Sequence, residues 1–178
     1  MTITDNLNND ISNAPTWFKE SISIKPSEQF INDKDGKISY SKWISKNDST
    51  NLLILIHGTG AHKKWWDPIA PQFLNETNVI AVDLPGMGDS DFRNNYSIKD
   101  FGKCIFSIID KEKIGMNIEN IYIVGHSLGG QVAAYVASEN KNLVTSLIMI
   151  DTFIRPPDYD PSQHEGGPLR KIKHYPDK

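Results

Sequence analysis

The sequence predicts an α/β protein built on a mainly parallel sheet with helices on both faces. Strand-like apolar runs alternate with helix-like stretches between about residues 52 and 151, as in a parallel sheet with crossover helices. The run Asn51–Ile56 is almost continuously apolar, which is typical of a strand buried on both faces. A further apolar run at residues 121–124 passes through Gly-His-Ser-Leu-Gly, residues 125–129, directly into a helix-like stretch.

The carboxyl ends of parallel strands are the expected place for a ligand site, so the order of the elements matters. Asp35-Gly36, between the first two strand-like runs, is a hairpin signal. The expected elements are strands near 28–32 and 37–45, a strand at 52–57, a helix near 65–76, a strand at 78–83, a helix at about 97–113, a strand at 121–124, a helix at 127–140 and a strand at 144–151. Residues at or just after these strand ends are His57, Asp83, Ser127 and Asp151.

The order strand, Gly-x-Ser-x-Gly, helix is typical of a nucleophile elbow. Gly125 and Gly129 lack Cβ and so allow the strand and the helix to approach closely. Ser127 would stand at the tip of the turn with its Oγ exposed, and the Leu128 N–H would point at a developing oxyanion. The alternative is an ordinary loop, because Gly and Ser also cluster in loops.

Two other loops support a site at the same edge. His57-Gly58-Thr59-Gly60 follows the buried strand, and its glycines let the backbone approach a ligand. The Thr59 N–H is the expected second oxyanion donor, with a plain turn as the alternative. Asp83 precedes a Pro-Gly turn; we expect it to accept backbone N–H bonds there, and a catalytic role is the alternative.

Together these motifs resemble the α/β-hydrolase family, from about residue 28 onward. Trp65 and Trp66 stand where a subgroup containing carbon–carbon bond hydrolases, esterases and haloperoxidases often carries a Trp. Ser127 at the elbow argues against haloalkane dehalogenases and epoxide hydrolases, which use Asp there. The resemblance implies a serine nucleophile acting on a small-molecule substrate, with no cofactor and no metal.

The family places the triad acid and the histidine base after the nucleophile, and here the sequence departs from the pattern. After Ser127 one more strand is readable, and it ends at Asp151, a candidate for the acid with a structural role as the alternative. The family's last core strands and final helix are missing, so we expect a C-terminally truncated chain. Its expected parts are a flexible leader at 1–27, a truncated core at 28–151 and the start of a lid segment at 152–178.

The five histidines do not clearly supply a base. His57 and His126, with Gly58, are expected to line the site, and His62 is a candidate for substrate contact. The order of the chain permits His164 and His174, but both lie in a loop-like stretch rich in Pro, Gly and Asp. We therefore expect the base beyond the present C-terminus.

Composition is that of one globular domain: 178 residues, 38% hydrophobic and 23% charged, with a net charge of −3. There is no clustered basic face, so nucleic acid and membrane partners are not expected. Cys104 is a single cysteine, which excludes a disulfide framework. The polar N-terminus is not a secretory signal, so a cytoplasmic location is expected. The sheet edge left after the last strand makes self-association a further expectation.

Three functions fit these observations. The first is a serine hydrolase acting on ester or carbon–carbon bonds of a small organic substrate, impaired by the missing His. The second is a pseudo-hydrolase that binds a small ligand without turnover. The third is one half of a split enzyme whose other chain supplies the His.

Overall fold

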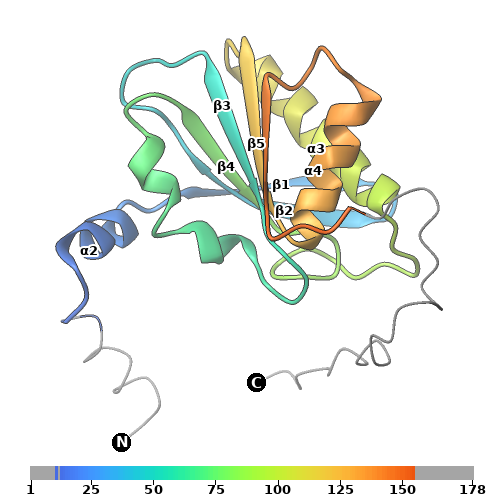
Figure 1. Ribbon diagram of the computed structural model, residues 1–178, viewed down its shortest axis with the longest axis horizontal. Coiled ribbons are helices and arrows are strands. Elements are labelled where there is room, and N and C mark those ends of the chain that lie inside the picture. Colours follow the sequence, from blue (N-terminus) through green and yellow to red (C-terminus); the bar gives the residue numbers. More distant parts are fainter. Residues whose placement is uncertain (1–10, 12, 155–178) are drawn as a thin grey trace, which may run out of the picture.

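The computed structural model describes residue 11 and residues 13–154. Within them a six-stranded sheet has the order β1-β2-β4-β3-β5-β6 (Figure 1). The strands are β1 (Ser27–Asp33), β2 (Gly36–Trp43), β3 (Asn51–Ile56), β4 (Asn78–Val82), β5 (Asn120–His126) and β6 (Ser146–Ile150). The helices are α2 (Thr16–Ser23), α3 (Ile98–Gly115) and α4 (Leu128–Glu139), with two 3₁₀ turns, η1 (Lys63–Trp66) and η2 (Ala70–Phe73).

The sheet is mainly parallel, as expected. β3 pairs in parallel with β4 and β5, and β5 pairs in parallel with β6. β1 and β2 form the antiparallel hairpin that Asp35-Gly36 indicated, and Gly36 has a φ of 130° in its turn. The parallel strands bring the segments after β3, β4, β5 and β6 to one edge of the sheet, where the predicted site residues lie.

Helices α3 and α4 cover one face of the sheet and pack against each other (Figure 1). α3 begins at a capping serine, because the Ser97 Oγ accepts the Asp100 N–H at 3.1 Å. The two helices and the sheet enclose the larger hydrophobic core. Its helix residues are Phe101, Cys104, Ile105, Ile108, Ile109, Val132, Ala133 and Val136.

The opposite face is covered by η1 and η2, and α2 packs beside η2. The helix expected at 65–76 is therefore wrong: the chain makes two short 3₁₀ turns there instead. Pro68 and Pro71 explain the difference, since each lacks a backbone donor and each disfavours helical geometry in the residue before it. The turns still bury apolar side chains against the sheet, namely Trp66, Ala70 and Leu74.

Helix α2 lies inside the segment expected to be a flexible leader. Its Ser21 is buried, and the carbonyl of Ile24, the residue after the helix, accepts the Trp43 Nε1–H at 3.0 Å. Residues 16–24 are thus tied to the sheet by a long-range interaction.

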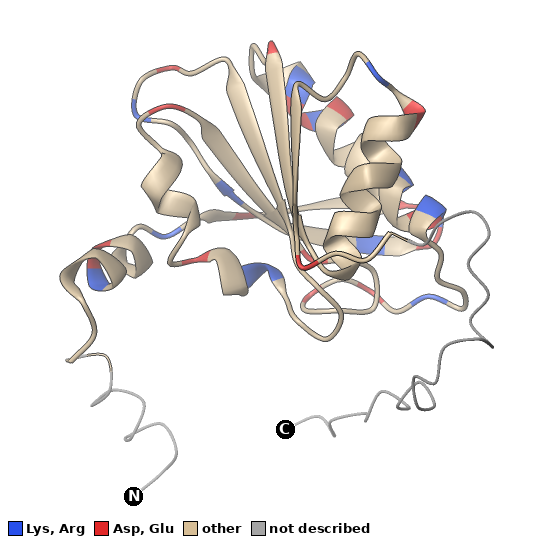
Figure 2. Cartoon of the chain, viewed as in Figure 1, with Lys and Arg blue, Asp and Glu red and all other residues tan. Residues whose placement is uncertain are grey.

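Along the ribbon, Lys and Arg positions alternate with Asp and Glu positions over loops and helices (Figure 2). Of the helices in the described part of the chain, none is long and apolar enough to cross a membrane.

Candidate active site

The turn at Ser127 joins β5 to α4 and has a strained backbone. Ser127 has φ 50° and ψ −115°, a conformation that residues other than glycine rarely adopt. The turn is held from β6, because the Ser127 N–H donates to the Ile150 carbonyl at 2.9 Å. Leu128 opens the helix, where the first N–H groups have no partner within the helix itself.

Two glycines make this turn possible, as the sequence predicted. A Cβ placed on Gly125 would lie 2.3 Å from the Gly129 carbonyl oxygen. A Cβ placed on Gly129 would lie 2.3 Å from the Ile56 carbonyl oxygen. The first turn of α4 therefore rests directly on the backbones of β3 and β5, and no larger residue fits between them.

The loop after β3 lies against the turn at Ser127. A Cβ on Gly58 would lie 3.2 Å from the Ser127 Cβ and 2.7 Å from the His126 Nδ1. Thr59 and Gly60 are exposed, and Gly60 has a φ of 73°. The structure thus brings together the two segments in which the sequence placed the oxyanion donors.

His57 is held inside this loop as a neutral ring. It is fully buried; its Nδ1 lies 2.8 Å from the Gly58 carbonyl oxygen, and its Nε2 accepts the Leu84 N–H at 3.2 Å. Burial lowers the pKa of the His57 imidazole, which outweighs the opposing effects of the Gly58 carbonyl and of Asp83. Since both ring nitrogens are engaged, His57 supports the loop and is not free to accept a proton from Ser127.

Asp83 has the structural role that was expected. Its carboxylate accepts the backbone N–H groups of Lys63 at 2.6 Å and of Asp89 at 2.9 Å. Lys63 is an unexpected partner: its Nζ is buried and lies 2.8 Å from Asp83, 2.5 Å from Asp89 and 3.4 Å from Glu28. Lys63 and Lys64 are adjacent in the sequence, and the pattern does not indicate which of them is buried. The one signal is that a buried Asp83 carboxylate needs a positively charged partner.

His62 lies in the loop after β3, and Asp151 lies between Ile150 and Thr152, both of which contact the Ser127 backbone. His62 lines a pocket of about 220 Å³ together with Lys63, Asp83 and Gly88, on the side of the loop next to the turn after β4. Asp151 is exposed, has a φ of 46° and follows the end of β6. His164 and His174 lie outside the described residues.

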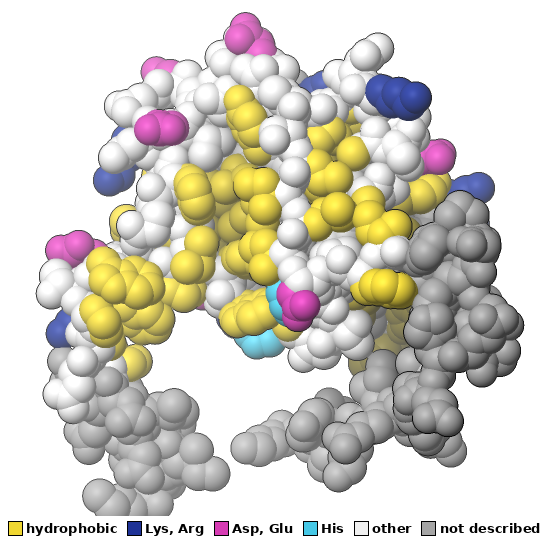
Figure 3. Space-filling model, viewed as in Figure 1, with side chains coloured by type: hydrophobic (Ala, Val, Ile, Leu, Met, Phe, Trp, Pro, Cys, Tyr) yellow, Lys and Arg dark blue, Asp and Glu magenta, His cyan; other side chains and the backbone are white. Residues whose placement is uncertain are grey.

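An apolar pocket of about 310 Å³ lies beside the turn at Ser127. We refer to it as the aromatic pocket; its lining residues are Trp65, Trp66, Ile69, His126 and Ile150. The Trp65 and His126 rings meet edge to face, with their centroids 4.8 Å apart. The pocket belongs to the face of the sheet where hydrophobic side chains gather over the strands (Figure 3).

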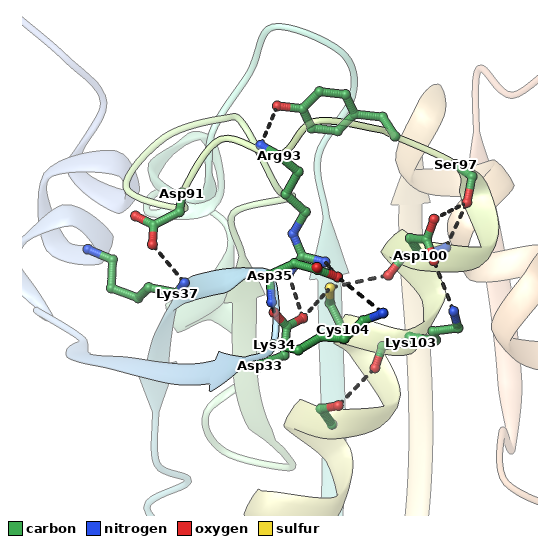
Figure 4. Close-up of polar contacts among 12 residues, drawn as sticks. Asp33, Lys34, Asp35, Lys37, Asp91, Arg93, Ser97, Asp100, Lys103 and Cys104 are labelled. Carbon is green, nitrogen blue, oxygen red and sulfur yellow. Dashed lines mark hydrogen bonds and ion pairs between the residues drawn. The ribbon is translucent and has the colours of Figure 1, made fainter.

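A larger, polar pocket of about 500 Å³ lies near the β1–β2 turn and the start of α3. Its main cation, Arg93, is already paired with Asp33 at 2.5 Å (Figure 4). Burial is the largest single effect and raises the pKa of the Asp33 carboxyl, but the hydrogen bonds from Arg93, the Asp35 N–H and Cys104, together with the Arg93 charge, outweigh it and leave that pKa below its ordinary value. The cluster also includes Cys104 and fastens the hairpin to α3, which is a structural role.

In the part of the chain that the structure describes, no group of three or more His, Cys, Asp or Glu side chains is arranged to hold a metal ion.

Comparison with known proteins agrees with this geometry. The sequence model of the alpha/beta hydrolase fold matches residues 51–171. A pimeloyl-[acyl-carrier protein] methyl ester esterase from Neisseria meningitidis is 34% identical over 111 residues, which is 62% of this chain and 40% of that protein. The enzyme of the same name from Pseudoalteromonas atlantica is 35% identical over 102 residues, 56% of this chain and 36% of that protein.

Solved structures give the same fold. An alpha/beta hydrolase from Novosphingobium aromaticivorans superimposes with a TM-score of 0.62 at 16% identity, over 70% of this chain and 44% of that one. The chain matches well under half the length of each of these relatives.

Proposed function

The chain belongs to the alpha/beta hydrolase fold family, and from that membership we propose that Ser127 is a nucleophile acting on an ester bond, or an activated carbon–carbon bond, of a small organic substrate. One observation carries the proposal. Ser127 is held in a strained turn at the carboxyl edge of the sheet, with the loop at Gly58 packed against it. Such strain is costly and is found mainly where a side chain must be presented to a ligand.

The chemistry follows from the positions of these groups. The Ser127 Oγ attacks the carbonyl carbon, and the electron pair of the C=O bond moves onto the oxygen. The N–H groups of Thr59 and Leu128 stabilise this oxyanion. When the tetrahedral intermediate collapses, the C–O bond to the alcohol breaks, and the proton that Oγ lost passes to the leaving oxygen. Water then hydrolyses the acyl–Ser127 ester and releases the acid.

A base must carry that proton. The family order places a histidine after the nucleophile, oriented by an acid, for which Asp151 is our candidate. His57 is unsuitable because both of its nitrogens are bonded. An ester is the preferred substrate over a carbon–carbon bond, because the two relatives compared above are named as methyl ester esterases.

A fluorophosphonate probe tests the proposal, because it reacts with an activated serine and adds a defined mass. We expect one label per chain by intact-mass spectrometry, formed slowly because His57 cannot act as the base, and none on Ser127→Ala. Ser138→Ala is the matched control, since Ser138 is an exposed serine of α4, the helix that follows Ser127; this variant should label as the unmodified chain does. Equal labelling of Ser127→Ala, or no labelling of the unmodified chain, would contradict a nucleophilic Ser127.

Both ring nitrogens of His57 are bonded, so His57 does not supply the base that turnover needs. This observation favours a second candidate function, ligand binding without turnover. Of the other described histidines, His62 lines a separate pocket and His126 packs on Trp65. The two functions differ in one measurement. A binding module would bind small apolar ligands equally well with Ser127→Ala and would not react with the probe.

A further inference from the structure

We propose that Thr152 is a positioning residue for the reaction at Ser127. Its hydroxyl fixes the peptide plane between Ser127 and Leu128, and so fixes the direction of the Leu128 N–H. The inference rests on the proposed function, in which that N–H stabilises the oxyanion. Thr152 acts through the backbone, without contact with the substrate.

The segment after β6 holds the Ser127 backbone at both of its polar groups. The Ser127 N–H donates to the Ile150 carbonyl at 2.9 Å. The Thr152 Oγ1 lies 3.3 Å from the Ser127 carbonyl oxygen and 3.1 Å from the Ile150 carbonyl oxygen. A hydroxyl has a single proton to donate, so the two acceptors share it, and both belong to the contact between β6 and Ser127. The Thr152 hydroxyl therefore stands at the centre of this contact, which we call the clamp.

The clamp reaches Leu128 through the geometry of the peptide bond. The Ser127 carbonyl and the Leu128 N–H belong to one planar trans unit and point in opposite directions. A donor that holds this carbonyl therefore also holds the direction of that N–H. Within α4 the same carbonyl accepts the Gly130 N–H at 3.0 Å, so Thr152 adds a bond from outside the helix.

Gly130 leaves the space that the Thr152 side chain occupies. A Cβ placed on Gly130 would overlap the Thr152 hydroxyl and would lie 2.8 Å from the Thr152 Cβ. Gly129 is required by the backbone of β3, whereas Gly130 is required by this side chain. The next residue is fastened as well, because the Gln131 Nε2–H donates to the Phe153 carbonyl at 2.9 Å. Thr152 and Phe153 are thus both held against the first turn of α4.

Backbone strain marks both sides of the clamp. Among the described residues other than glycine, a positive φ occurs at Asp48, Ser127 and Asp151. Ser127 has a φ of 50°, and Asp151, which directly precedes Thr152, has a φ of 46°. Such conformations are costly and persist only where the surrounding structure fixes them. The bent backbone at Asp151 brings the Ile150 carbonyl and the Thr152 hydroxyl to the same residue, Ser127.

The first test measures the rate of fluorophosphonate labelling over a range of probe concentrations. Oxyanion stabilisation acts in the transition state, so Thr152→Val should lower the maximal rate constant about fivefold and leave the half-saturating concentration unchanged. Thr152→Ser keeps the hydroxyl and should restore most of the rate. Thr145→Val is the matched control, because Thr145 Oγ1 accepts the Ile121 N–H at 3.1 Å beside the other end of β6. This variant should change neither constant.

The second test needs no reaction, because hydrogen exchange of the Ser127 amide, followed by NMR, reports the clamp directly. Thr152→Val should speed this exchange about fivefold. The Ile54 amide, at the centre of the sheet, reports global unfolding and should change much less.

Substitutions at Asp151 test the bent backbone by the same exchange measurement. Asn tolerates a positive φ, so Asp151→Asn should leave the Ser127 amide protected. A β-branched residue disfavours that conformation, so Asp151→Val should speed exchange at Ser127 as Thr152→Val does.

No rise in exchange at Ser127, or an equal rise at Ser127 and Ile54, would overturn the inference. So would a maximal labelling rate that Thr152→Val leaves unchanged in a chain that reacts at Ser127. The failure of the proposed function has a different signature. It would appear as no labelling of the unmodified chain, while Thr152→Val still speeds exchange of the Ser127 amide, which supports the clamp.

Discussion

Lys63 and Asp83 make two bonds to each other in the interior. The Lys63 N–H donates to one carboxylate oxygen of Asp83 at 2.6 Å, and the Lys63 Nζ donates to the other at 2.8 Å. The pair joins the end of the loop after β3 to the turn after β4. The backbone that carries Thr59 is thereby anchored at both ends, by His57 on one side and by Lys63 on the other.

Removing the Lys63 charge should strongly destabilise the fold. Lys63→Met leaves the fully buried Asp83 carboxylate without its cation, so the free energy of unfolding should fall by about 3 kcal/mol or more. Urea denaturation measures this change. Lys64→Met is the matched control, because the neighbouring lysine is exposed and its loss should cost less than about 0.5 kcal/mol. Similar midpoints for the two variants would show that the buried pair contributes little.

Adding one methyl group at Gly129 should be more damaging than adding one at Gly115. A Cβ at Gly129 would meet the backbone oxygens of Ile56 and His57 at 2.3 and 2.6 Å, and neither can move without breaking the sheet. Gly129→Ala should therefore lower the free energy of unfolding by about 2 kcal/mol or more. At Gly115, the last residue of α3, no atom lies within 4 Å of the added Cβ. Gly115→Ala should be neutral or stabilising, and a loss there as large as at Gly129 would refute the steric explanation.

His57 should resist protonation. Its folded-state pKa is lowered from 6.5 by burial, so the unfolded chain binds this proton more readily than the folded one. The stability that depends on neutral His57 is therefore fully present above pH 6.5 and is lost as the pH falls from there toward the lower folded-state pKa. A pH titration of the histidine ring signals by NMR should give His57 a midpoint below 6.5, against about 6.5 in urea. A folded-state midpoint at or above the urea value would contradict the assigned cause.

The thiol of Cys104 should be almost unreactive in the folded protein. Burial raises its pKa to about 11, and its exposed fraction is 1%. At pH 8 about one molecule in a thousand would then carry the reactive thiolate. Dithionitrobenzoate should modify the folded chain orders of magnitude more slowly than the chain in urea. Since Cys104 is the single cysteine, the signal is unambiguous, and equal rates would show that the α3 face of the core is open.

Much of the candidate site could be predicted because its signals are local. Gly125, Ser127 and Gly129 lie within five residues, and the glycines are required by the close approach of one strand and one helix. Asp83 follows a buried strand and precedes a Pro-Gly turn, so its role as a backbone acceptor could be predicted from short-range geometry. The structure confirms both interpretations.

The errors have physical causes of their own. Apolar residues at 65–76 suggested a helix, but two prolines interrupt it, and contact with the sheet is made by 3₁₀ turns instead. Helix α2 was not among the expected elements, and its position depends on partners such as Trp43 and η2.

The sequence by itself determined the α/β class, the order of the elements and the turn at Ser127, because periodicity, glycine sterics and turn chemistry act over a few residues. Only the tertiary structure decided that Lys63 is buried, since its two nearest carboxylate partners lie 20 and 26 positions further along the chain. The aromatic pocket is likewise a tertiary feature. Trp65, His126 and Ile150 come from three separate segments, and their contact exists because parallel pairing brings the carboxyl ends of β3, β5 and β6 to one edge of the sheet.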